Sequence, residues 1–245
     1  MKQWIACWNI FYKDLRAYYL KPPNISWGLL FPIAWTGMFF IRTGSGAENV
    51  LMLLPGVIAI SILFGTTSML AVTITFEKQS NGLDRLLLSP LPLELIMLAK
   101  TAGAVLFGIV NTVVPIVIAA LLADLSGLQW ELLVPAIILI AIVCAFLGLL
   151  VAVATSRVFE AQMVSNFFRF PMIFLCGLFF PLSLLPVFLL PLSYLLPLTY
   201  GVDILQGAVN GKHQLPYLCN FSLLILFCLG MFTLSLHIIR RKWIL

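Results

Sequence analysis

Long apolar runs separated by short polar segments dominate the chain. A transmembrane helix requires roughly 17 to 25 predominantly apolar residues, and six runs are near or above that length. We therefore expect an all-α integral membrane protein with six transmembrane helices. The expected spans are 25–41, 50–76, 96–123, 132–155, 163–180 and 218–239.

Residues 181–200 are also apolar but are dense in proline. Proline removes a backbone amide, and a lipid-exposed helix cannot leave backbone groups without partners. We therefore interpret this region as an outer re-entrant helical hairpin rather than a seventh span. Its marker residues are Pro181, Pro186, Pro191, Pro197 and Tyr200.

The first residues differ from the spans because large apolar side chains alternate with charges at helical spacing over 4–19. This pattern is typical of an amphipathic helix that lies in the membrane interface. A plain helical lead-in to the first span is the alternative. The chain then divides into an N-terminal interfacial helix, 1–24, and a six-span domain, 25–245.

Positive charges give the orientation, because cytoplasmic loops of membrane proteins are enriched in Lys and Arg. With six spans and both termini inside, 12 of the 14 Lys and Arg residues lie on the cytoplasmic side. A seventh span would move Arg240, Arg241 and Lys242 outside. The count favours six spans and places 77–92 in the cytoplasm.

Residues 77–92, EKQSNGLDRLLLSPLP, form the longest polar interruption between two spans. Asn81 is suited to cap a short helix with Asp84 in its first turn, and Pro90 ends it. Helical spacing gives this helix an apolar side and a solvent-facing polar side. The apolar side consists of Leu83, Leu86 and Leu87, and the polar side consists of Asp84 and Arg85.

A helix this short is marginal in water by itself. We expect it to lie against the base of the membrane domain or in a groove of another subunit. An ordinary solvated loop is the alternative that the spacing leaves open.

The segment resembles the cytoplasmic coupling element of the type 2 ABC exporter permeases. Glu77 ends a span, Gly82 follows five residues later, and a Leu-rich helix stops at Ser89-Pro90. Two later segments, 171–181 and 192–203, are similar to the last third of the same family.

The sequence departs from the family pattern at three positions. Leu83 stands where Thr is often found, Cys176 where Ser is common and Gln206 where Arg is frequent. These departures bear on the subfamily and leave the family resemblance intact.

The resemblance implies a six-helix membrane subunit that pairs with a separate ATP-binding subunit, as a homodimer or with a related permease. ATP and Mg would be bound by that partner, and this chain would bind no cofactor. The second cytoplasmic loop, with Arg157 and Glu160, would be a second partner contact. The residues expected to couple to the ATPase are Glu77, Lys78, Gly82, Leu83, Asp84, Arg85, Leu86, Leu87, Ser89 and Pro90.

Composition agrees with a membrane protein, with 62% hydrophobic and only 9% charged residues. The net charge of +5 sits at the ends of apolar runs, which argues against a nucleic-acid partner. Five cysteines without CxxC spacing predict neither a disulfide framework nor a metal site. Acidic residues and histidines are scattered, so we expect a transport subunit rather than an enzyme.

Three polar residues within the spans are candidates for lining a transport pathway. Asn111 lies in the third span, and Asn166 and Arg169 lie in the fifth. A charge inside a span is a functional suspect because its burial in lipid is costly. Snorkelling of Arg169 to the interface, and helix packing by Asn111, are the cheaper interpretations.

Together, the sequence patterns and the family resemblance predict the permease subunit of an exporter in the plasma (inner) membrane. The short loop 42–49 leaves no external domain to select cargo, which favours an amphipathic drug-like or lipid-linked substrate, with polysaccharide cargo also known in the family. A haem-export permease and an ATP-independent secondary transporter are the alternatives. A membrane-embedded lipid enzyme would need clustered acids or histidines, which the sequence lacks.

Overall fold

The computed structural model describes residues 2–19, 34, 37–38, 47–178 and 182–244. Within these residues every regular element is helical, which confirms the all-α prediction. Four helices are long and apolar enough to cross a membrane: Asn49–Gln79, Leu93–Leu122, Trp130–Ala154 and Tyr217–Trp243. They correspond to the second, third, fourth and sixth expected spans. Nearly all of the first expected span, 25–41, lies outside the described residues.

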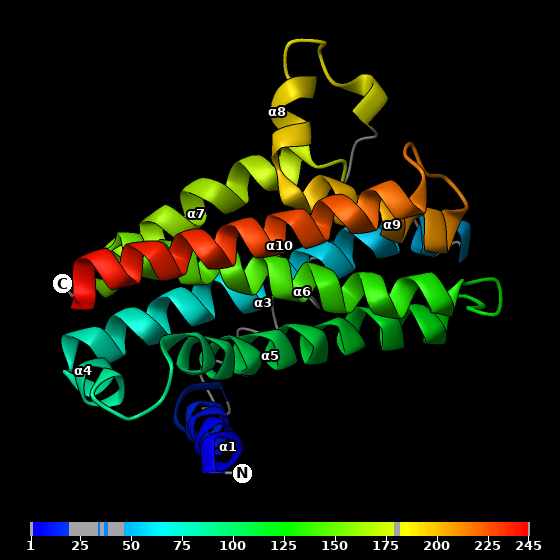
Figure 1. The fold of residues 1–245 in the computed structure, drawn as a ribbon. Coiled ribbons are helices and arrows are strands. Elements are labelled where there is room, and N and C mark those ends of the chain that lie inside the picture. Colours follow the sequence, from blue (N-terminus) through cyan, green and yellow to red (C-terminus); the bar gives the residue numbers. More distant parts are fainter. Residues whose placement is uncertain (1, 20–33, 35–36, 39–46, 179–181, 245) are drawn as a thin grey trace.

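These helices are α3 (Ala47–Gln79), α5 (Leu93–Leu122), α6 (Trp130–Ala154) and α10 (Tyr217–Ile239). They run side by side, with α6 between α5 and α10 (Figure 1). The most apolar windows of α3 and α6 are 78% buried inside the chain, against 28% for α5 and α10. The first pair therefore forms the core, and the second pair presents apolar surface outward.

The close contact between α3 and α6 depends on a residue without a side chain. A Cβ at Gly148 would lie 2.6 Å from the carbonyl oxygen of Thr67. The Thr67 hydroxyl also donates to the carbonyl of Cys144 at 3.3 Å. Small and hydroxyl-bearing residues allow helix backbones to approach in this way in membrane proteins.

The fifth expected span is the part of the prediction that changes most. Helix α7 covers Val158–Leu175, so it begins before and ends before the expected 163–180. Gly177 adopts a left-handed conformation with φ of 77°, which breaks the helix where the apolar run continues. With 18 residues, including Glu160 and Arg169, α7 is not among the four helices apolar enough to span.

The proline-dense region contains a short turn, Leu182–Leu184, then α8 (Leu190–Leu195) and α9 (Pro197–Asn210). Pro191 and Pro197 occupy the first turns of these helices, where a missing amide costs nothing. Helix α9 is about 21 Å long, shorter than the hydrocarbon core of about 30 Å. The re-entrant arrangement itself stays a prediction, and Pro181 lies outside the described residues.

The N-terminal region forms α1 (Lys2–Asp14), followed by a π-helical turn, Leu15–Tyr19. Figure 1 shows α1 nearly end-on beneath α5, so it crosses the direction of the long helices. Trp4 and Trp8 are exposed on one side, while Asp14 and Tyr19 are buried on the other. The helix and its following turn thus have an exposed aromatic side and a buried side, and the location in the membrane interface stays a prediction.

Candidate functional site: the coupling element and its buried charges

The predicted short helix exists as α4 (Gly82–Leu87), at the same end of the molecule as the C-terminus (Figure 1). It is separated from the end of α3 by a tight turn. Asn81 makes this turn with φ of 56°, a conformation that Asn tolerates better than most residues. Its side chain makes no capping hydrogen bond, so the predicted cap is wrong and Asn81 contributes backbone geometry instead.

One side of α4 packs on the bundle, as the spacing predicted. Leu83 is fully buried and belongs to the main hydrophobic core, while Leu86 and Leu87 pack against it half-buried. Asp84 and Arg85 are exposed. Leu88 follows the helix with 86% of its surface exposed. The element is thus anchored by one leucine and presents charged and apolar side chains outward.

Beside this anchor, a lysine is enclosed between two carboxylates. Lys100 of α5 is fully buried, and its Nζ lies 3.1 Å from Asp14 Oδ2 and in hydrogen-bond contact with Glu77. Asp14 belongs to α1, and Glu77 belongs to the last turns of α3. We call Lys13, Asp14, Glu77 and Lys100 the charge cluster. It joins three elements at the point where α3 leads into α4.

Lys13 closes the cluster from its solvent side. Its Nζ lies 2.6 Å from Glu77 Oε1 and 3.0 Å from Asp14 Oδ1, with about half of the side chain exposed. Burial acts to lower the pKa of Lys13, but the bond to Glu77 and the charge of Asp14 outweigh it and raise that pKa. The cluster therefore contains two lysines and two carboxylates, which compensate each other's burial.

Of these four residues, sequence reasoning selected only Glu77. The available signals were weak: Lys100 lies within an apolar helix, and Asp14 is an acidic residue in an amphipathic helix. Residues 86 positions apart come together here. Sequence spacing could not reveal that pairing.

The C-terminal turn, Arg240–Ile244, also contributes to this end of the molecule. Arg240 forms an ion pair with Glu94 at the start of α5. The Nζ of Lys78 lies 4.5 Å from the ring centre of Trp243, a cation–π contact. The end of α10 is thus fastened to both helices that flank α4.

The second predicted contact loop lies beside the first. The Gln79 side chain donates to the carbonyl of Ser156 at 3.4 Å, which joins the end of α3 to the loop before α7. Glu160 accepts from the Ser156 amide at 3.2 Å, and Arg157 precedes the first turn of α7. Arg157 and Glu160 are both exposed. Both loops can therefore face one partner.

The candidate pathway residues pack on α3. Arg169 is 2% exposed and lies over the ring of Phe64 at 4.3 Å, with its guanidinium in contact with Asn166. The side chain is buried in this chain, so the snorkelling interpretation is wrong. Asn111 is buried against Gly65, the next residue of α3. Whether these residues line a pathway stays a prediction.

At the other end of the bundle, Asp203 of α9 organises a second polar group. It accepts from the backbone amides of Gln214 at 2.8 Å and Leu215 at 3.0 Å, and from the Asn220 side chain at 2.7 Å. These bonds fix the loop between α9 and α10.

The first of the two later family-like segments, 171–181, contacts the helix that carries the second. The Gln206 side chain of α9 donates to the carbonyl of Gly177 at 2.7 Å. Gln206, three residues after the second segment, thus links α9 to the segment that begins at Pro171. The position at which the sequence departs from the family pattern has a structural role in this chain.

The arrangement of α4 and the charge cluster suits a mechanical contact with another protein better than catalysis. Within the described ranges, no three His, Cys, Asp or Glu side chains gather as they would around a metal ion. The polar groups of the charge cluster are already paired with one another. What the site offers a partner is the exposed side of α4, with the adjoining loop.

Comparison with known proteins gives concordant matches. The family model described as ABC-2 type transporter matches residues 5–210. The inner membrane transport permease YadH of Escherichia coli K12 is 24% identical over 97% of this chain and 96% of its own length. Nodulation protein J of Sinorhizobium fredii is 25% identical over 98% of this chain and 93% of its own length.

Proposed function

Because the chain belongs to the ABC-2 type transporter family and is thus the membrane subunit of an ABC transporter, we propose that α4 is the contact through which an ATP-binding subunit drives it. The family implies such a partner. Hydrolysis of ATP with Mg would take place on that subunit, and this chain would form the pathway.

The observation that carries the proposal is the way α4 is built. Leu83 fixes the helix to the core, Arg85 is exposed on it, and Leu88 is exposed directly after it. The charge cluster lies directly behind, so a force on α4 would reach α1, α3 and α5 together. A surface loop without an anchor would move alone and transmit nothing.

The finer parts of the proposal follow from the membrane domain. Two copies, or one with a related permease, would enclose the pathway, with six spans each and both termini in the cytoplasm. ATP binding would move the coupling elements and switch the spans between inward-facing and outward-facing states. The outer mouth would be lined by the 181–200 hairpin.

We propose export of an amphipathic or lipid-linked substrate. The loop 42–49 is too short for an external selecting domain, so cargo entering from the membrane is favoured. Residues Asn166 and Arg169 would lie near the pathway. Transport of only a water-soluble polymer by vesicles containing the complex would contradict this part of the proposal.

The test is recovery of the ATP-binding subunit with the tagged chain from mildly solubilised membranes, followed by an ATPase assay. We compare wild type with Arg85→Glu and Leu88→Asp, which change exposed side chains. The matched control is Lys212→Glu, a reversal of an exposed charge in the loop after α9. Each α4 variant should lower recovery about tenfold, equivalent to about 1.4 kcal/mol of binding.

The thermal stability of all four proteins should be similar, because the altered residues are exposed. Equal recovery of the ATP-binding subunit by Arg85→Glu, Leu88→Asp and wild type would show that α4 is not the contact. An equal loss of recovery in Lys212→Glu would show that the net charge of the chain, and not the α4 site, governs recovery of the ATP-binding subunit.

A further inference from the structure

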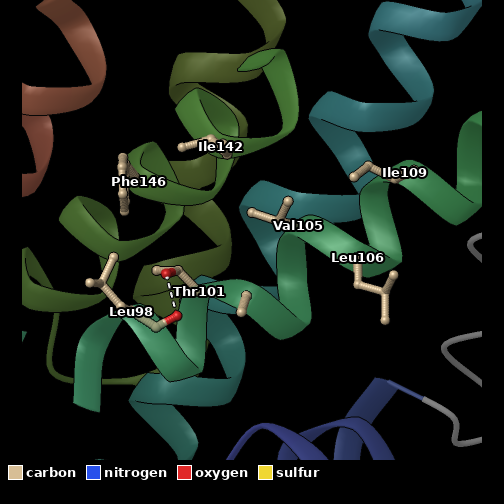
Figure 2. A pocket seen from close by; sticks show the side chains of 8 residues that line it. Leu98, Thr101, Val105, Leu106, Ile109, Ile142 and Phe146 are labelled. Carbon is tan, nitrogen blue, oxygen red and sulfur yellow. Dashed lines mark hydrogen bonds between the residues drawn. The ribbon is translucent and has the colours of Figure 1, made fainter. Parts of the chain in front are cut away.

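A groove between α5 and α6 is separate from the coupling element. Figure 2 shows its lining: Leu98, Val105 and Ile109 lie along α5, and Ile142 and Phe146 lie on α6. The hollow has a volume of about 360 Å³. Phe146 also stacks near Phe232 of α10, with ring centres 4.9 Å apart. Phe146 thus lies between the groove and α10.

The described residues that line the groove offer an occupant no free polar partner. Thr101 is the polar side chain of the lining, and its hydroxyl donates to the carbonyl of Leu98 at 2.9 Å (Figure 2). The other lining side chains are apolar. A water molecule needs two to four polar partners to be held in a cavity, so hydrocarbon suits this lining better than water or a polar ligand.

The length of the groove matches one leaflet of the bilayer. From Leu98 to Ile109, α5 rises about 16 Å, and half of a hydrocarbon core of about 30 Å is about 15 Å. A helix segment of that length and about 10 Å across fills about 1,300 Å³. The hollow is several times smaller, which suits a hydrocarbon chain.

Positive charge lies at the end of the groove nearest α4. Glu94 precedes Leu98 by one helical turn and is paired with Arg240, whose side chain is 62% exposed. A guanidinium has five N–H donors, so Arg240 retains donors beyond those used by Glu94. Arg241 and Lys242 follow it and are exposed. This end is suited to an anionic headgroup.

We propose that the groove binds one acyl chain of an anionic phospholipid from the leaflet on the α4 side, with its net negative headgroup at Arg240. The apolar lining contacts the acyl chain, and the length of the groove matches the thickness of one leaflet. The basic turn after α10 favours a negatively charged headgroup. A lipid in this position would fill the space between α5 and α6 next to the Arg240–Glu94 pair. The proposal holds whether or not α4 binds an ATP-binding subunit.

The test uses the detergent-purified chain with dioleoylphosphatidylglycerol added, and native mass spectrometry to count retained lipid. Ala102→Trp fills the groove from an exposed position on α5. Val113→Trp places the same side chain on the same helix beyond the groove, at a residue that is 51% exposed. We expect one retained lipid for wild type and Val113→Trp and about tenfold weaker retention for Ala102→Trp.

The headgroup is tested with Arg240→Gln and with dioleoylphosphatidylcholine as the neutral lipid. Wild type should prefer the anionic lipid about fivefold, and Arg240→Gln should remove that preference. Ala102→Leu is the smaller groove-filling variant, and it replaces Ala102→Trp in the test if that protein does not fold. Unchanged retention by the groove-filling variant, an equal loss in Val113→Trp, or equal binding of the two lipids by wild type would overturn the proposal.

Discussion

Two carboxylate-centred clusters, one beside α4 and one in the loop between α9 and α10, are built differently. These two elements lie at opposite ends of the bundle (Figure 1). At the α4 end, Asp14 and Glu77 enclose Lys100, and the three residues come from α1, α3 and α5. At the other end, Asp203 is held by two backbone amides and Asn220, all within 17 residues of it.

The two clusters differ in whether a movement of one helix would be passed to other helices. The Asp203 group is local and keeps one loop in place. The charge cluster joins elements far apart in the sequence, so movement of α4 and the end of α3 must either carry α1 and α5 along or break ion pairs. We infer that the α4 end is the mechanically coupled end and that the Asp203 end is a fixed support.

The largest expected effect is that of Lys100→Met, which leaves the two buried carboxylates Asp14 and Glu77 with only the half-exposed Lys13 as a cationic partner. Breaking a buried ion pair from one side costs about 3–5 kcal/mol. We expect a marked loss of thermal stability in detergent. Adding Glu77→Gln to this variant should recover most of the loss, because it removes the excess negative charge and leaves Asp14 paired with Lys13. A Lys100→Met protein as stable as wild type would show that the cluster does not hold α1 in place.

A smaller effect is expected for Asp203→Ala, which leaves the buried Asn220 side chain, and the more exposed amides of Gln214 and Leu215, without their acceptor. An unsatisfied buried group costs about 1–3 kcal/mol. We expect lower thermal stability and unchanged recovery of the ATP-binding subunit, since the loop lies at the far end. Ser222→Ala is the control, because that exposed hydroxyl bonds only within its own helix. Loss of partner recovery in Asp203→Ala would remove the distinction between the two ends.

The smallest effect is expected from alkaline pH and from Lys13→Gln. The folded state raises the pKa of Lys13, so its contribution is complete below the ordinary value of 10.5 and is lost as pH rises through the higher folded pKa. Burial likewise raises the pKa of Tyr18 above 10, which adds in the same direction.

Thermal unfolding measured from pH 8 to pH 11.5 should therefore show a decline that begins above about pH 10. The decline should be shallower in Lys13→Gln. At pH 8 the variant should lose no more than about 1 kcal/mol, because Lys13 is half exposed. An identical alkaline decline in wild type and variant would show that the outer lysine adds nothing to the cluster.

The sequence by itself determined the class of the protein and most of its elements. Runs of apolar residues long enough to cross a bilayer located α3, α5, α6 and α10, because the bilayer fixes the length of such helices. The spacing of Leu83, Leu86 and Leu87 located α4 and its buried side. Such local patterns depend on helix geometry and solvent alone, so they can be read without knowledge of the fold.

Only the tertiary structure decided which polar residues meet. The enclosure of Lys100 by Asp14 and Glu77, the burial of Arg169 over Phe64, and the pairing of Arg240 with Glu94 all join residues distant in the sequence. The hydrophobic pattern also did not predict the end of α7 at Leu175, because Gly177 in a left-handed conformation ends the helix although the apolar run continues. Hydrophobicity selects helices, but the packing of those helices selects the partners of each buried charge.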